Sequence, residues 1–148
     1  MSPMRSILAV LTGVVLVIFV RSVLEQTLVG ALADAPLDES VYLAIRNRPL
    51  VLAATLVGHA LAATLAGYIV ARIAGEREVQ HALIAAAVLV AAYAFAFTAD
   101  NPMLPPTWAR IVILLITAPA LAAGAAVRAQ VRALHAEGAG PSRPEERS

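Results

Sequence analysis

The stretch 50-LVLAATLVGHALAATLAGYIV-70 is 21 residues long, and His59 is its only side chain of a type that ionises near neutral pH. An α-helix rises about 1.5 Å per residue, so a run of this length can cross a hydrocarbon core of about 30 Å. Lipid offers no hydrogen-bond partners to the backbone, so a spanning segment of this kind must be helical. The stretch therefore predicts a membrane-spanning helix.

Three further apolar blocks of similar length lie on either side of this one. The chain is 60% hydrophobic and only 14% charged, whereas a typical soluble domain is about 25% charged. We predict spans at about 6–31, 49–72, 79–98 and 107–128. Together they make residues 1–137 an all-α, integral membrane four-helix bundle, and residues 138–148, GAGPSRPEERS, a disordered tail.

The composition also excludes several classes of function. The net charge of +1 leaves no electrostatic footprint for a nucleic acid. The absence of cysteine excludes thiolate metal sites and iron–sulfur clusters. No HExxH, serine–histidine or phosphate-loop motif is present, so we expect a protein that is not an enzyme and carries no cofactor. Ala31-Leu32-Ala33 resembles a signal-cleavage site, but charges precede it, and we expect the first span to be retained.

Orientation follows from the arginines in short loops, because the chain has no lysine. Five arginines lie near the helix ends on the side of the N-terminus, and three lie on the other side. This bias predicts that both termini are cytoplasmic, in a multi-pass protein of a bacterial inner membrane. Tyr42 and Trp108 would then be aromatic anchors at the outer interface.

The links between spans differ in composition. Residues 33–49 form the longest link, in which 38–47 can make a short helix. Gly75 suits the end of the second span, and Glu76 and Glu78 suit the start of the third. Residues 129–137 can continue the fourth helix into water.

A group of polar residues stands out near the end of the first span. Counted from Arg5, Arg21 lies about 24 Å and Glu25 about 30 Å up the helix, near the outer boundary. The two residues are spaced i, i+4 and can pair on one helix face. A sharper hypothesis joins Arg21, Glu25, Gln26 and His59 in one intramembrane polar patch, since His59 lies about 20 Å above the inner end of its own helix.

His59 has several interpretations, because ionisable groups at this depth are costly and often functional. It could relay a proton, ligate a metal or pigment, or bond a partner helix. The structural alternative is a neutral ring bonded to Thr55 or to a backbone carbonyl. A haem held by two histidines is excluded, since His81 and His135 lie at other depths.

Small residues indicate close helix packing. Gly58, Ala62, Gly67 and Gly124 are candidates for sites where helix backbones approach each other in lipid. Pro119 removes one backbone hydrogen bond and is expected to kink the fourth helix, either as a hinge or as a static feature. The similar runs that begin at His59 and Pro119, each followed by ALAA, suggest a faint internal repeat.

Two segments, 66-AGYIVARIAGEREVQHALIAAAV-88 and 105-PPTWARIVILLITAPALAAGAAVR-128, resemble small four-span bacterial integral membrane proteins of unassigned function. The resemblance implies the four-span fold and assigns no activity. From the residues, we expect a non-catalytic structural or accessory subunit that contacts membrane lipid and forms a homo-oligomer or joins a larger membrane complex. The alternative is a small transporter or channel that uses Arg21, Glu25 and His59.

Overall fold

The computed structural model of the chain describes residues 3–34, 36–75, 77–99, 101 and 103–138. Within these residues the chain forms five α-helices and no strand. The helices are α1 (Pro3–Ala31), α2 (Glu39–Arg46), α3 (Pro49–Ala74), α4 (Glu78–Ala96) and α5 (Thr107–Gly138). The predicted all-α fold class is confirmed to this extent.

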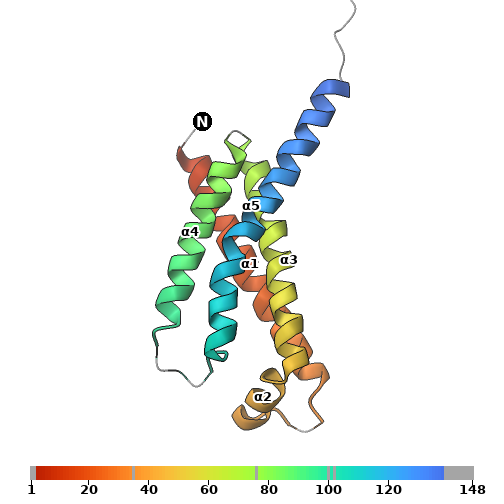
Figure 1. The fold of residues 1–148 in the computed structure, drawn as a ribbon, viewed down its shortest axis with the longest axis vertical. Coiled ribbons are helices and arrows are strands. Elements are labelled where there is room, and N and C mark those ends of the chain that lie inside the picture. Colours follow the sequence, from red (N-terminus) through yellow and green to blue (C-terminus); the bar gives the residue numbers. More distant parts are fainter. Residues whose placement is uncertain (1–2, 35, 76, 100, 102, 139–148) are drawn as a thin grey trace, which may run out of the picture.

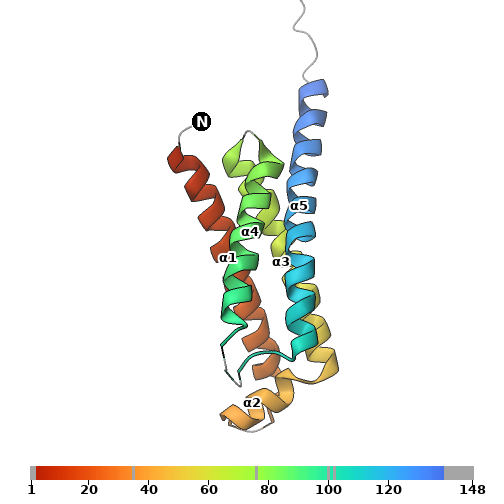
Figure 2. The same cartoon turned by 60° about the vertical axis from the view of Figure 1, so that its left-hand side comes forward.

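Four of the described helices, α1, α3, α4 and α5, are long and apolar enough to cross a membrane. They run side by side (Figures 1 and 2). One end of the molecule, here called the terminal end, holds the start of α1, the turn between α3 and α4, and the C-terminal part of α5. The opposite end, here called the α2 end, holds α2 and the link between α4 and α5.

The centre of the arrangement is α3, which contacts α1, α4 and α5. Its apolar window is 44% buried inside the chain, against 17% for α1 and 28% for α4 and α5. The middle of the core combines eight buried residues from all four long helices: Val17, Ala63, Ala66, Ala86, Leu89, Tyr93, Ile113 and Leu121. Toward the terminal end the core consists of alanines and one valine: Ala9, Val70, Ala71, Ala74, Ala82, Ala85 and Ala125.

Two glycines set the distance between α3 and α5. A Cβ atom added at Gly67 would collide with the backbone carbonyl of Leu121, and one added at Gly124 would collide with that of Thr64. Backbone therefore lies against backbone, which only a residue without a side chain allows. Ala62 is also buried, and a Cβ at Gly58 would meet the side chain of Leu24 on α1. The predicted small-residue faces are thus used inside this chain.

The predicted short helix in the first link is confirmed as α2. Asp38 caps it, since its Oδ1 accepts hydrogen bonds from Val41 N at 2.8 Å and Ser40 Oγ at 2.7 Å. These bonds hold the pKa of the Asp38 carboxyl below its ordinary value. The predicted helix end at Gly75 is also confirmed, because this glycine has a left-handed φ of 72° and its N–H bonds Ala71 O.

Two predicted boundaries need correction. The third span was placed to residue 98, but α4 ends at Ala96 and a turn follows, in which Thr98 N bonds Phe95 O. The tail was placed from 138, but Gly138 is still helical in α5, and the rest of the predicted tail lies outside the described residues. The predicted extension of the fourth helix over 129–137 is confirmed.

Pro119 lies inside α5, which continues as one helix on both sides of it. Figure 1 shows that α5 changes direction partway along, so that its blue C-terminal part leans away from the other helices. A proline removes one helical hydrogen bond and crowds the preceding turn, which accounts for a bend of this kind.

Candidate functional site

Four polar residues meet at the α2 end, and we call them the polar cluster: Arg21 and Glu25 from α1, and Tyr42 and Arg46 from α2. Glu25 Oε1 accepts a hydrogen bond from the Tyr42 hydroxyl at 2.8 Å and lies 3.8 Å from Arg46 Nε. Arg46 is only 3% exposed, and its Nη1 donates to the backbone carbonyl of Met103 in the link between α4 and α5. The cluster therefore ties three parts of the chain together.

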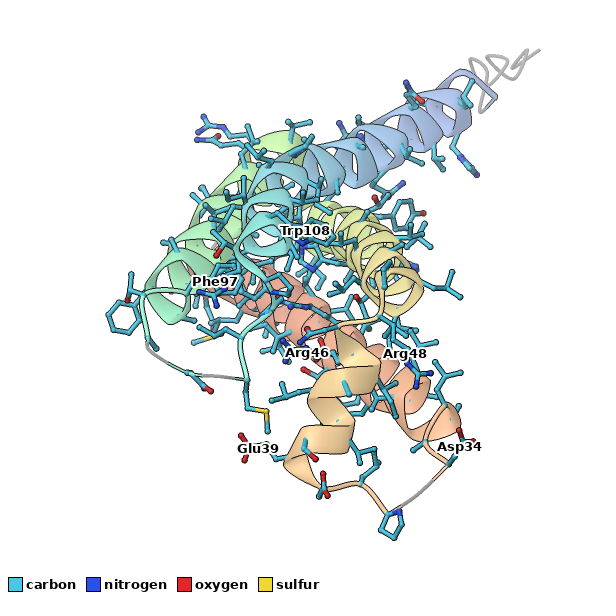
Figure 3. All side chains as sticks on the ribbon, turned by 60° about the horizontal axis from the view of Figure 1, so that its bottom comes forward. Asp34, Glu39, Arg46, Arg48, Phe97 and Trp108 are labelled. Atoms are coloured by element: carbon cyan, nitrogen blue, oxygen red, sulfur yellow. The ribbon has the colours of Figure 1, made fainter. Side chains whose placement is uncertain are left out.

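The local sequence explains why α2 presents these side chains inward. Val41, Tyr42, Ile45 and Arg46 are spaced i, i+1, i+4 and i+5, so they share one side of the helix. Ile45 is buried with Val29 and Val51, at the ends of α1 and α3. This apolar contact fixes the rotation of α2 and so points Arg46 toward the long helices, whereas Arg48 lies at the periphery (Figure 3).

The predicted pair between Arg21 and Glu25 is wrong. Although the two residues share a helix face, no ion pair joins them in the described structure, and Glu25 pairs with Arg46 instead. The guanidinium carbon of Arg21 lies 5.4 Å from the centre of the Tyr93 ring on α4. This is a cation–π contact, which is favourable but leaves the five N–H donors of arginine available.

A cavity of 210 Å³ opens beside the polar cluster. Its lining comes from α1, α2 and α4 and comprises Ile18, Arg21, Ser22, Glu25, Gln26, Tyr42 and Tyr93. Three of the four residues predicted as a polar patch, Arg21, Glu25 and Gln26, thus lie around one space. His59, the fourth, is not part of this lining and lies behind Tyr93.

His59 is completely buried, and its Nε2 lies 2.9 Å from Thr117 Oγ on α5. The Thr117 hydroxyl donates its only proton to Ile113 O at 2.6 Å, so its oxygen must accept from His59 Nε2–H. His59 Nδ1 then carries the lone pair, and no described residue bonds it. The predicted bond to Thr55 is wrong, because that hydroxyl bonds carbonyls of its own helix.

Tyr93 connects His59 with the polar cluster. Its ring meets the His59 ring edge-on, with centroids 5.7 Å apart, and stacks on Phe97 at 5.8 Å. Arg21 lies over the same ring. The predicted patch is therefore divided: a tyrosine stands between the cavity and the histidine.

The charges of the polar cluster do not cancel. Burial, and then the hydrogen bond to Glu25, raise the pKa of Tyr42 to about 12, so this residue is a neutral donor at pH 7. Two arginines then face one carboxylate, which leaves one positive charge in excess. Arg46 is the arginine that lies against Glu25, so the excess charge is on Arg21, at the cavity.

A second set of polar contacts closes the terminal end. Glu78 is 4% exposed and lies 3.3 Å from Arg132 Nη1, which also donates to Gly75 O at 2.8 Å. Arg5 Nε donates to Ile73 O at 2.6 Å. These contacts bind α1 and α5 to the turn between α3 and α4. Between them and the cavity lies the alanine-rich part of the core.

The sequence did not single out four residues that matter here, namely Tyr42, Arg46, Tyr93 and Thr117, as partners in the site. Tyr42 was predicted to be an interface anchor, and Arg46 was counted only for orientation. Their i, i+4 spacing on the predicted short helix was a signal that they share a face. For Tyr93 and Thr117 the signal was weaker: each places one hydroxyl in the middle of a mostly apolar span.

The described residues contain no group of three or more His, Asp or Glu side chains placed to hold a metal ion. Comparison with protein-family models, curated proteins and solved structures finds no match to this chain. No relative therefore assigns this chain to a family, and the class of protein is inferred from its own sequence and structure. The four long helices of the described residues have the length and the apolar composition of a multi-pass membrane protein, and a polar cavity lies near one end.

Proposed function

We propose that this chain is a non-catalytic accessory or structural subunit of a bacterial inner membrane, a four-helix bundle with both termini in the cytoplasm. The positive-inside rule supports the orientation. Five arginines belong to elements of the terminal end and three to those of the α2 end: Arg5, Arg72, Arg77, Arg128 and Arg132, against Arg46, Arg48 and Arg110.

The observation that carries the proposal is the length of α5. Its 32 residues extend about 48 Å, whereas a hydrocarbon core is about 30 Å thick. The C-terminal part projects beyond the other helices (Figure 2) and carries Leu134, which is 67% exposed. An isolated helical segment is marginal in water unless it packs on something. A partner subunit, or a second copy of this chain, would cover it.

Site-specific photo-crosslinking in intact membranes tests this proposal. A photoreactive residue in place of Leu134 should give one discrete crosslinked species. The same residue in place of Phe95, which is 82% exposed near the α2 end, is the matched control and should give none. Two differently tagged copies of the chain distinguish self-association from a different partner. If Leu134 crosslinks only to lipid, the subunit proposal is wrong.

The cavity favours a second candidate, a small transporter or channel. Its polar lining reaches Tyr93, with His59 behind it. Against this candidate, the core between the cavity and the terminal end is packed with buried alanines. Flux measurements on the purified protein in liposomes distinguish the two candidates. The subunit proposal predicts no proton or anion flux. Flux that His59→Ala abolishes would contradict it and support the transporter.

A further inference from the structure

The side chain of Arg21 has unused capacity for an anion. Among the described residues it makes a cation–π contact with Tyr93, but no hydrogen bond or ion pair. A guanidinium has five N–H donors in a planar fork that matches a phosphate or carboxylate. Glu25 does not serve as that anion, because Tyr42 and Arg46 already hold its carboxylate.

The cavity beside Arg21 opens toward the lipid-facing side of α1. Ser22 and Gln26 line it and are both exposed. Its volume of 210 Å³ equals the liquid volume of about seven water molecules, which is enough for a phosphodiester group. Counted along α1 from Arg5, this point lies about 24 Å up the helix, near the edge of a hydrocarbon core about 30 Å thick.

Below the cavity, the same side of α1 becomes apolar. Leu11, Val15 and Ile18 continue the line of Ser22 and Gln26 at intervals of three or four residues, and all three are exposed by 42% or more. A shallow, open depression of 360 Å³ lies on this part of α1, and its lining comes from α1 alone: Leu11, Thr12, Val15, Leu16 and Phe19. The surface thus has a cationic polar end at interface depth and an exposed apolar strip, Leu11, Val15 and Ile18, beneath it.

We infer that this surface binds a membrane phospholipid. Its phosphate occupies the cavity and accepts hydrogen bonds from Arg21, and one acyl chain lies along Leu11, Val15 and Ile18. The lipid phosphate neutralises the positive charge that the polar cluster leaves in excess. A soluble anion would satisfy Arg21 equally well, but it would leave the apolar strip of α1 without a matching group. The inference does not depend on the subunit proposal.

Thermal unfolding of the purified protein in detergent, with added ligands, tests the inference. The three ligands are phosphatidylglycerol, a galactolipid with the same acyl chains but no phosphate, and soluble glycerol phosphate. We compare the wild type with Arg21→Gln and with Ser22→Trp, which fills the cavity and leaves the arginine in place. Arg48→Gln is the control, since it removes an exposed arginine from the same end of the molecule.

Phosphatidylglycerol should stabilise the wild type and Arg48→Gln alike, and the other two ligands should have little effect. Loss of one charge-assisted donor group should weaken the apparent affinity of Arg21→Gln by about tenfold or more. Ser22→Trp should also lose the stabilisation by phosphatidylglycerol. If Arg21→Gln does not fold, Ser22→Trp tests the inference by itself. Equal responses of Arg21→Gln or Ser22→Trp and the wild type would overturn the inference. Equal stabilisation by the galactolipid would also overturn it, because acyl-chain binding alone would then account for the effect. Equal stabilisation by glycerol phosphate would overturn it too, because the site would then be one for a soluble anion.

Discussion

Replacement of Gly67 by alanine should loosen the contact between α3 and α5. The added Cβ would collide with the carbonyl oxygen of Leu121, which is the nearest atom, and would lie 2.7 Å from the carbonyl carbon, whereas ordinary contacts begin at 3.4 Å. Neither helix backbone can rotate away as a side chain can, so the helices must separate by about 0.7 Å or more. A gap of that size forfeits a quarter to a half of the dispersion energy of each contacting atom pair.

We therefore expect Gly67→Ala to lower the free energy of unfolding by about 1–3 kcal/mol, the usual cost of overpacking. The control is Gly30→Ala, because nothing lies within 4 Å of a Cβ added there. Both changes place alanine for glycine in a helix, which by itself favours the helix by up to about 1 kcal/mol. The difference between the two changes in the free energy of unfolding therefore isolates the effect of helix packing at Gly67.

The assay is equilibrium unfolding by sodium dodecyl sulfate in mixed micelles, followed through the single tryptophan, Trp108, at the start of α5. Gly124→Ala opens the same contact from the other helix, so the double variant with Gly67→Ala should cost less than the sum of the two single changes. Equal stability of Gly67→Ala and Gly30→Ala, or full additivity of the two interface changes, would show that the backbones do not touch here.

Three further predictions concern the polar residues. Arg46→Gln and Glu25→Gln should each destabilise the protein, and a double-mutant cycle should give a coupling energy of about 1 kcal/mol or more. Glu25→Gln leaves the buried Arg46 charge without its partner, and Arg46→Gln leaves the Glu25 carboxylate only the more exposed Arg21 to pair with. Tyr42 has a folded-state pKa of about 12, above its ordinary value of 10. The stability difference between the wild type and Tyr42→Phe should therefore be constant below pH 10 and shrink between pH 10 and 12. Thr117→Val removes the acceptor of the His59 N–H and should cost about 1 kcal/mol in unfolding experiments.

The first and the third of these predictions have a matched control. Arg48→Gln should leave stability unchanged, because this neighbouring arginine is exposed. Among the described residues, the Thr64 hydroxyl bonds only Ala60 O of its own helix, so Thr64→Val should cost less than Thr117→Val. A double-mutant cycle without coupling, a stability difference between the wild type and Tyr42→Phe that stays constant from pH 10 to 12, or equal costs of the two threonine changes would each contradict the corresponding contact.

The helices themselves could be predicted from the sequence because each depends on local properties. A run such as 50–70 is helical wherever lipid surrounds it. The end of α3 at Gly75 and the cap of α2 at Asp38 depend on backbone conformation and on one side chain, within four residues. The ends of α4 and α5 were misplaced by only a few residues, since helix ends fray without a strong stop signal.

The partners within the site could not be predicted, because they depend on how the helices are rotated and aligned with one another. His59 meets Thr117 only at the register that Gly67 and Gly124 allow between α3 and α5. Sequence spacing compares residues on one helix, so it offered Thr55, four residues away, as the partner. Likewise it paired Glu25 with the residue four positions earlier.

The contact between Glu25 and Arg46 also explains why the cavity is open to a ligand. On an isolated α1, Arg21 and Glu25 would pair with each other as i, i+4 neighbours. In the folded chain α2 supplies Arg46, which lies against the carboxylate and leaves Arg21 directed at Tyr93. The small helix between the spans thus converts a neutral helix surface into a cationic one. If this competition sets the charge of the cavity, Arg46→Gln should let Glu25 pair with Arg21 and reduce stabilisation by phosphatidylglycerol, although the arginine that binds the phosphate is unchanged. Undiminished lipid stabilisation in Arg46→Gln would show that Arg21 is available to the lipid whether or not α2 competes for Glu25.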